Sequence, residues 1–560
     1  MENRANRANG SPSRATPLAN RAIPPANGER LQRLLLVIAL AVWLGLSLWY
    51  SSRMNWLSAD DAYITLRYAQ HWAQGYGPVY NIGERVEGYT NFLWVLTLTP
   101  LIGLGVPGTL AVKLLAGLSG AGAICLVWFL GRRIAGRDSW LGPAAALALA
   151  LNGTFIWWTL PGSMEVSTLA LTLLAGFYLL LGREGADERA RLRETLGAGV
   201  LLGLSVLTRP DAVLFGIPAL VVVLLEKKRR PLRAALLLAP GLFMVAGQLI
   251  FRLAYYGDWL PNTFYAKVGI NLRVIGRGLE YLLTFVKAQA LLFVGAVFFP
   301  WKRWGAKALP FLTGCLLYWV YLAAIGGDWM SLRLFHHTVP ILVLVGVGGY
   351  LSLFERLRGT NWGKAVRIPA AVLGLAGLVY LTHLEADPSM AFSPLRFGVQ
   401  QRYSTARWLN GHADPEDRVA LTSTGIIPYF TDLYTIDMVG LMDPHIAREG
   451  VSIAGYGFPG HERFDNDYVL AKKPEWFVLN ITPGELKSGA QPTLFYEMDL
   501  LRRPEFWAEY PLVLPPYPTL TILHRRDDAR GLERLESGEW ESSYGFVPPY
   551  ARRGATPAGI

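Results

Sequence analysis

The stretch LLLVIALAVWLGLSLW, from Leu34 to Trp49, is an apolar run without a single charged side chain. A helix that crosses a bilayer needs about 20 predominantly apolar residues, and this run approaches that length. It is longer than a typical signal-peptide core and is not followed by a small-residue cleavage site, so we interpret it as a retained anchor. The composition agrees, because 52% of the residues are hydrophobic and only 17% are charged, against about a quarter charged in soluble domains.

Further apolar runs of this kind follow along the chain. The predicted spans number about eleven and cover residues 34–50, 109–131, 139–158, 165–182, 194–208, 212–226, 233–252, 281–300, 308–325, 338–354 and 368–382. Lys and Arg gather in alternate loops, so the positive-inside rule places the N-terminus in the cytoplasm. The apolar stretch 91–105 would reverse every later loop if it crossed the membrane. We therefore interpret it as a helix in the outer interface.

The ends of the chain differ from the middle in composition. Residues 1–30 are rich in Arg, Asn, Pro and Ala without apolar periodicity, which predicts a disordered cytoplasmic tail. Residues 31–384 form the predicted membrane domain, and 385–560 have the composition of a soluble α/β domain on the outer side. For that domain we expect an amphipathic helix at 402–410 and strands at 419–424, 433–438, 475–480 and 519–523.

The charge and the cysteines exclude some classes of protein. The formal net charge is +11, but the arginines lie beside apolar runs, which is a sign of membrane topology rather than of nucleic-acid binding. Cys125 and Cys315 each lie inside an apolar run. Neither a disulfide nor a cysteine-based zinc site is therefore predicted.

The loop after the first span contains an acidic pair. It reads SADDAYITLRYAQHWAQG over residues 58–75 and carries Asp60 and Asp61. Both carboxylates could simply occupy the favoured first turn of a helix. Alternatively, a carboxylate at the edge of the membrane has its pKa raised by desolvation, which suits a general base. Arg67, two turns further on, could balance this charge or hold a phosphate.

Other polar residues are predicted at the same face of the membrane. Glu87, Tyr89 and Asn91 precede the interfacial helix and could hydrogen-bond the hydroxyl groups of a sugar, although a turn and a helix cap explain them equally well. Ionisable groups at the membrane boundary are costly and therefore candidates for function. The further candidates for substrate binding are Glu165, Asp211, Asn262, Tyr265 and Asp328.

Three cations stand out because the outer loops otherwise contain few. Arg209, Lys267 and Arg333 lie near the membrane plane and could bind a lipid-linked phosphate by charge-assisted hydrogen bonds. His336 is a further candidate for substrate binding. His336 and His337 would diverge by about 100° on a helix, so they do not predict a metal site.

Five motifs in this order resemble the bacterial polytopic glycosyltransferases of the GT-C class, and most of all the mycobacterial-type terminal β-1,2-arabinofuranosyltransferases. The motifs are Asp60-Asp61, EGYTNFLW (87–94), YGDWLPNTFYAK (256–267), GGDWM (326–330) and IDMVGLMDPH (436–445). The resemblance implies a GT-C fold and transfer of a sugar, arabinofuranose in that branch, from a polyprenyl-phosphate donor to the hydroxyl of a cell-envelope glycan.

The resemblance also implies roles for residues. Asp60 would be the general base and Asp61 would assist it, while Arg209, Lys267 and Arg333 would stabilise the departing lipid phosphate. No metal ligand is predicted, and participation of a divalent cation stays open. The expected location is the bacterial cytoplasmic membrane, with the site on the outer side.

Other functions remain open at this point. Close variants would glycosylate a protein or lipid A instead of a glycan. A flippase for lipid-linked sugars belongs to a different class, and would place ionisable groups at mid-bilayer and show internal repeats. The ionisable residues of this chain lie mostly toward one face, and no repeat is visible, so an enzyme is the favoured prediction.

Overall fold

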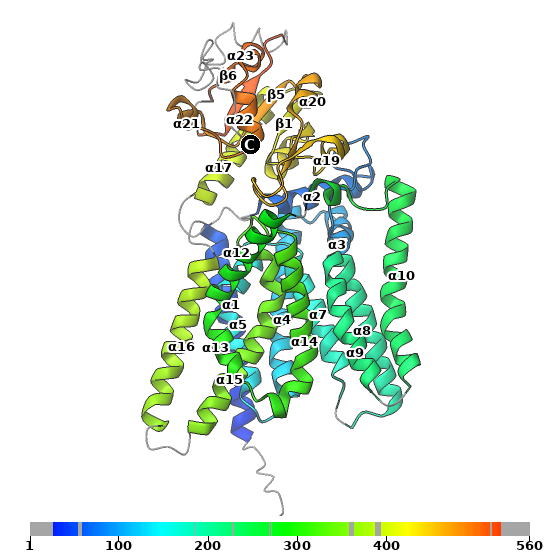
Figure 1. The fold of residues 1–560 in the computed structure, drawn as a ribbon, viewed down its shortest axis with the longest axis vertical. Coiled ribbons are helices and arrows are strands. Elements are labelled where there is room, and N and C mark those ends of the chain that lie inside the picture. Colours follow the sequence, from blue (N-terminus) through cyan, green and yellow to red (C-terminus); the bar gives the residue numbers. More distant parts are fainter. Residues whose placement is uncertain are drawn as a thin grey trace, which may run out of the picture.

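The fold consists of a helical bundle and an α/β domain at one end of it (Figure 1). A computed structural model of the chain describes residues 26–53, 59–183, 185–226, 229–267, 269, 271–357, 363–386, 394–515 and 518–527. Most of the predicted N-terminal tail and everything after residue 527 lie outside these ranges. The prediction of a polytopic helical membrane protein with a C-terminal α/β domain is confirmed.

Each predicted span coincides with one helix or with a consecutive pair. The helices are α1 (Ala26–Arg53), α4 (Gly108–Ala135), α5 (Leu141–Ala150) with α6 (Gly153–Trp158), α7 (Val166–Leu180), α8 (Glu188–Thr208), α9 (Val213–Leu225), α10 (Arg230–Tyr256), α12 (Leu272–Ala288) with α13 (Ala290–Val297), α14 (Trp301–Ala324), α15 (Val339–Arg356) and α16 (Gly363–Ala386). By length and composition, five helices in the described ranges could cross a bilayer, or six if the pair α12–α13, bent by 74°, is one broken span. The others are shorter or begin with a polar turn.

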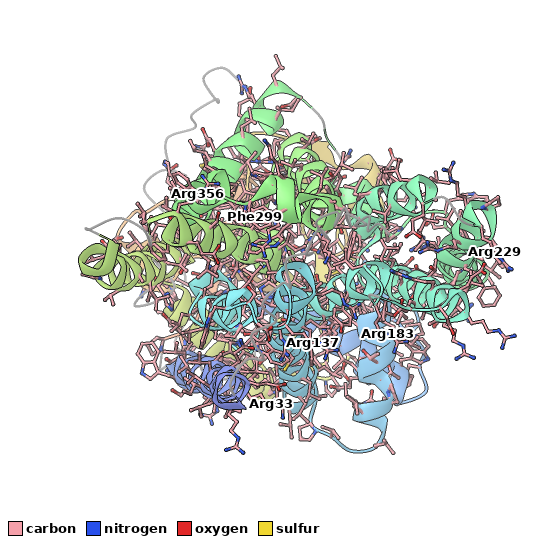
Figure 2. All side chains as sticks on the ribbon, turned by 90° about the horizontal axis from the view of Figure 1, so that it is seen from below. Arg33, Arg137, Arg183, Arg229, Phe299 and Arg356 are labelled. Carbon is pink, nitrogen blue, oxygen red and sulfur yellow. The ribbon has the colours of Figure 1, made fainter. Side chains whose placement is uncertain are left out.

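The two ends of the bundle differ in charge. Figure 2 looks onto the end opposite the α/β domain, where Arg33, Arg137, Arg183, Arg229 and Arg356 lie. These residues come from the loops and helix ends that were predicted on one side of the membrane. The cost of placing a cation in hydrocarbon keeps such residues at the helix ends. Their gathering at one end of the bundle is the pattern that the positive-inside rule describes.

The α/β domain contains a five-stranded sheet in the order β2-β1-β5-β7-β6. Its strands are β1 (Arg418–Leu421), β2 (Tyr434–Asp437), β5 (Trp476–Leu479), β6 (Leu512–Val513) and β7 (Thr521–His524). Strands β2, β1 and β5 are parallel, whereas β7 and β6 run antiparallel to their neighbours. Helix α17 (Pro394–His412) and four of these strands were predicted. Strand β6 was missed because two residues are too short to show alternation.

Two helices in the segment between α1 and α4 join the bundle to the α/β domain. Helix α2 (Asp60–Ala73) begins at the acidic pair, and α3 (Phe92–Gly103) is the predicted interfacial helix. Both lie at the end of the bundle that faces the sheet (Figure 1). One apolar cluster includes Tyr63 and Leu66 of α2 together with Ile436 and Phe477 of the sheet. The α/β domain is therefore packed onto the bundle through a shared core.

Candidate active site

The two acidic residues at the start of α2 have different environments. Asp60 faces the α/β domain, where its Oδ2 accepts the backbone N–H of Gly425 at 3.0 Å and its Oδ1 accepts that of Ile426 at 2.9 Å. Arg402 of α17 lies 3.8 Å from Oδ1. Burial raises the pKa of Asp60, and the nearby Arg402 and the two amides oppose that change. Both oxygens of Asp60 are thus engaged in holding the domain.

Asp61 faces the other way, toward the bundle. Its Oδ2 lies 3.1 Å from Nη1 of Arg333, and its side chain is 23% exposed against 12% for Asp60. Arg333 is held in turn by Asp328, through Nε to Oδ2 at 2.7 Å and Nη2 to Oδ1 at 3.0 Å. Such two-point pairing fixes the plane of the guanidinium. Asp61 is therefore the member of the pair that keeps a carboxylate oxygen available for a ligand.

The glycines of the GGDWM motif set the position of Asp328. Gly326 and Gly327 have φ angles of +87° and +74°, a region that suits glycine. A Cβ on Gly327 would also lie 2.7 Å from Tyr281. This tight turn connects α14 to the short helix η2 (Arg333–Thr338). Asp328 and Arg333, five residues apart, are thereby brought face to face.

A second group of charges surrounds Arg209. Arg209 Nη1 lies 3.0 Å from Oε1 of Glu165, and its Nη2 lies 2.7 Å from Oδ2 of Asp211. Asn91 Nδ2 reaches Oε2 of Glu165 at 3.4 Å. Pro210, which has no backbone N–H, begins the short helix η1 (Pro210–Ala212) directly after Arg209 and breaks α8 from α9 at this point. These residues, all of which were predicted at the outer face of the membrane, thus lie together in one group.

Lys267 differs from both arginines in its pairing. It ends α11 (Asn262–Lys267), and within the described ranges no carboxylate lies within salt-bridge distance of its Nζ. Desolvation by the surrounding protein lowers its pKa, with Asp61 opposing this change and Arg333 and Arg209 adding to it. Lys267 is thus electrostatically coupled to both groups of charges. It is the cation of this region that is free to meet an incoming anion.

Several predicted site residues lie elsewhere. Arg67 is buried and donates to the carbonyl oxygens of Tyr80 at 2.7 Å and Leu433 at 2.9 Å, and also to that of Pro428. It therefore connects α2 to the α/β domain. Protein carbonyls surround the guanidinium, which was predicted either to balance the acidic pair or to hold a phosphate. His336 is fully buried and stacks on a phenylalanine ring, at 5.0 Å between centroids.

Four more predicted residues are engaged in contacts of α10 and α11, two with side chains of α10 and two with the α/β domain. Glu87 is paired with the buried Arg252, and the hydroxyl of Tyr89 lies 3.1 Å from that of Tyr256. The remaining two have partners in the domain itself. Asn262 donates to the carbonyls of Gly440 and Leu441 at 2.9 and 3.0 Å, and the ring of Tyr265 lies under the guanidinium of Arg448 at 4.4 Å.

Two residues that the sequence did not single out lie at the charged groups. Arg402 approaches Asp60, and His461 is electrostatically coupled to Asp61, Lys267 and Asp328. Both come from the α/β domain, where charged residues are ordinary and carry no signal of their own. In the part of the chain that the structure describes, no three His, Cys, Asp or Glu side chains are arranged to hold a metal ion.

Comparison with known proteins finds families and relatives that match parts of the chain. Residues 91–251 match the family described as dolichyl-phosphate-mannose-protein mannosyltransferase, and residues 395–531 match a domain of unknown function, DUF8728. The terminal β-(1→2)-arabinofuranosyltransferase of Mycobacterium tuberculosis is 32% identical over 278 residues, which is 47% of this chain and 42% of that protein. The protein of the same name from Corynebacterium glutamicum is 28% identical over 346 residues, 53% of this chain and 49% of that protein. The match therefore spans less than half of each relative.

Solved structures show the same fold at low sequence identity. ArnT from Cupriavidus metallidurans in the apo state has a TM-score of 0.55 at 13% identity, and the match covers 89% of this chain and 98% of that one. The same protein bound to undecaprenyl phosphate has a TM-score of 0.53 at 14% identity, and the match covers 90% of this chain and 99% of that one. The chain thus has the fold of the GT-C membrane glycosyltransferases. Within that class its sequence is similar to the terminal arabinofuranosyltransferases, as its motifs predicted.

Proposed function

We propose that this protein is a glycosyltransferase that moves a sugar from a polyprenyl-phosphate donor to a hydroxyl group of a cell-envelope glycan. The sugar proposed is arabinofuranose, since the curated relatives carry that name. The observation that carries the proposal is the ion pair of Asp61 and Arg333 where the bundle touches the α/β domain, with Lys267 near enough to interact electrostatically with both. A base and cations for a leaving phosphate are the two needs of this transfer.

Lys267 is proposed as the main contact of the donor phosphate. Arg209 and Arg333 each already face two carboxylates, so a phosphate would compete with those partners. Lys267 has no such partner in the described ranges, and its ammonium offers three donors without needing to give up an ion pair. Arg333 lies in the same electrostatic neighbourhood and would add to the stabilisation of the phosphate.

Asp61 is proposed as the general base, in place of Asp60. An oxygen that already accepts a backbone N–H is less able to take a proton from an alcohol, and both oxygens of Asp60 are engaged in this way. Asp61 would accept the proton of the acceptor hydroxyl while the new bond from that oxygen to the anomeric carbon forms. The bond from the anomeric carbon to the phosphate oxygen breaks, and polyprenyl phosphate leaves with the electron pair.

The orientation in the membrane is part of the proposal. The arginines at the end of the bundle shown in Figure 2 support a cytoplasmic location for that end. The charged groups and the α/β domain would then lie outside the bacterial cytoplasmic membrane. A lipid-linked donor in the outer leaflet and an envelope glycan are both accessible from that side.

The test is a transfer assay with purified protein and a short panel of polyprenyl-phosphate sugars. Native protein should release polyprenyl phosphate with one of these donors when a glycan acceptor is present. Lys267→Met should raise the KM for the donor about tenfold or more, since it removes a charge-assisted contact. The matched control is Lys487→Met, an exposed residue of α21 (Pro483–Lys487), which should change nothing. Movement of the donor across liposomes without any transfer would overturn the proposal in favour of a flippase.

A further inference from the structure

One loop of the α/β domain lies against the end of the bundle that carries the charged residues. It joins the short strands β3 (Val451–Ser452) and β4 (Arg463–Phe464) and covers residues 453–462. Asn271, at the start of α12, donates its side-chain N–H to the carbonyl of Ala454 at 2.9 Å. Arg273, in the first turn of α12, places its guanidinium over the ring of Tyr456 at 4.0 Å.

A partly buried ion pair holds this loop to the GGDWM turn. Arg277 of α12 contacts both carboxylate oxygens of Glu462, at 2.7 and 3.1 Å. The same guanidinium donates to the carbonyl of Gly457 at 2.7 Å and to that of Gly326 at 3.2 Å. Glu462 also accepts the backbone N–H of Gly455 at 2.7 Å. The loop, α12 and the turn that carries Asp328 are thus linked through one guanidinium.

The loop brings His461 to the charged groups. The imidazole of His461 meets the ring of Trp329 edge-on, at 5.7 Å between centroids. The preceding residue, Gly460, packs against Lys267, since a Cβ built on it would lie 3.2 Å from Cε of that lysine. The charges of Asp61 and Asp328 both act on His461. His461 is therefore close to the proposed phosphate contact and to the proposed base.

The hydrogen bond of His461 determines which of its ring nitrogens is available. Nδ1 lies 3.3 Å from the carbonyl oxygen of Pro459. Because a carbonyl can only accept, Nδ1 carries the proton and donates it. Burial lowers the pKa of His461, which favours the neutral ring, with Asp61 opposing this change. Nε2 is then an unprotonated acceptor, and it has no hydrogen-bond partner among the described residues.

We propose that His461 Nε2 accepts a hydrogen bond from a hydroxyl group of the donor sugar, so that the α/β domain contributes directly to recognition of the sugar. An acceptor nitrogen suits a hydroxyl and does not suit a phosphate oxygen, which has no proton to donate. The position beside Lys267 places His461 where the sugar is covalently attached to its phosphate. This inference rests on the proposed function, because it presumes a lipid-phosphate sugar in this site.

The experiment measures direct binding to the full-length purified protein of two lipids. One is undecaprenyl phosphate, and the other is the same lipid phosphate carrying arabinofuranose. His461→Ala should weaken binding of the sugar-bearing lipid about three- to tenfold, as expected for one hydrogen bond, and leave the bare lipid phosphate unchanged. His461→Gln, which keeps an acceptor oxygen, should recover part of the loss. His445→Ala, in α19 (Pro444–Glu449) of the same domain, is the matched control and should bind both lipids as the native protein does.

The same measurement on Lys267→Met separates this inference from the proposed function. Under the proposed function, Lys267→Met weakens binding of both lipids. Suppose that Lys267→Met weakens binding of both lipids, whereas His461→Ala and His461→Gln weaken binding of the two lipids equally or affect neither. The role of His461 in sugar recognition is then refuted and the phosphate site stands. If native protein binds neither lipid, or Lys267→Met has no effect on either, the proposed phosphate site is refuted and this inference falls with it.

Discussion

Replacing each member of the acidic pair by asparagine distinguishes the base from the anchor. Asp61→Asn keeps the shape of the side chain and an oxygen that can still accept from Arg333, but it cannot take a proton at neutral pH. Asp60→Asn instead changes a contact between α2 and the α/β domain. The two neighbouring substitutions should therefore differ in kind: one should affect turnover and the other stability.

The expected size of each effect follows from the contacts. General base catalysis contributes about 10²- to 10⁴-fold, so Asp61→Asn should lower kcat by that factor, or about 3 to 5 kcal/mol of transition-state stabilisation. In the native protein the two carboxylate oxygens of Asp60 accept the backbone N–H groups of Gly425 and Ile426 at 3.0 and 2.9 Å. In Asp60→Asn the side-chain NH₂ replaces one of these oxygens and cannot accept. One charge-assisted hydrogen bond is then lost, which costs about 1.5 to 3 kcal/mol of folding stability.

The assay combines initial rates at saturating donor with thermal unfolding of the same purified samples. Asp61→Asn should unfold at the native temperature and be nearly inactive. Asp60→Asn should unfold at a lower temperature and keep turnover within about tenfold of native at a temperature where it is folded. The opposite result, a native melting temperature with more than 100-fold loss in Asp60→Asn and near-native turnover in Asp61→Asn, would refute our assignment of the base to Asp61.

Three further predictions concern stability and topology. Arg67→Met should lower the unfolding temperature strongly, because it leaves three buried carbonyls without their donor, and each unsatisfied carbonyl costs about 1 to 3 kcal/mol of folding stability. The control is Arg407→Met at an exposed position, and equal melting temperatures of the two variants would contradict the structural role of Arg67. Burial raises the pKa of Glu497 to about 7, so in this range the folded state keeps a proton that the unfolded state loses. Between pH 5 and 8 the native protein should therefore lose about 2.5 kcal/mol of stability from this residue. Glu497→Gln should flatten the decline in melting temperature with pH, and an unchanged slope would count against this prediction. In intact cells whose outer membrane has been made permeable, a membrane-impermeant maleimide should label Lys487→Cys and not Arg356→Cys; the reverse pattern would invert the proposed orientation.

The residues of the charged groups were candidates in the sequence for a reason that is local. Arg209, Lys267 and Arg333 were recognisable because the outer loops otherwise contain few cations, and an ionisable group at the membrane boundary is costly. The carboxylates Glu165 and Asp328 were found in the same way. His461 and Arg402 gave no such signal, since they belong to a domain of ordinary soluble composition. Only the packing of that domain on the bundle brought them to the site.

The acidic pair shows the same division between sequence and structure most clearly. Apolar runs and the distribution of arginine predicted the spans and the end of the bundle where Asp60 and Asp61 lie, because the free energy of burying apolar side chains acts locally along the chain. The resemblance to the GT-C class rested instead on five short motifs. Tertiary structure alone decided that the two aspartates differ. Neighbours on a helix point about 100° apart, and the backbone amides that occupy Asp60 come from residues more than 360 positions further along the chain.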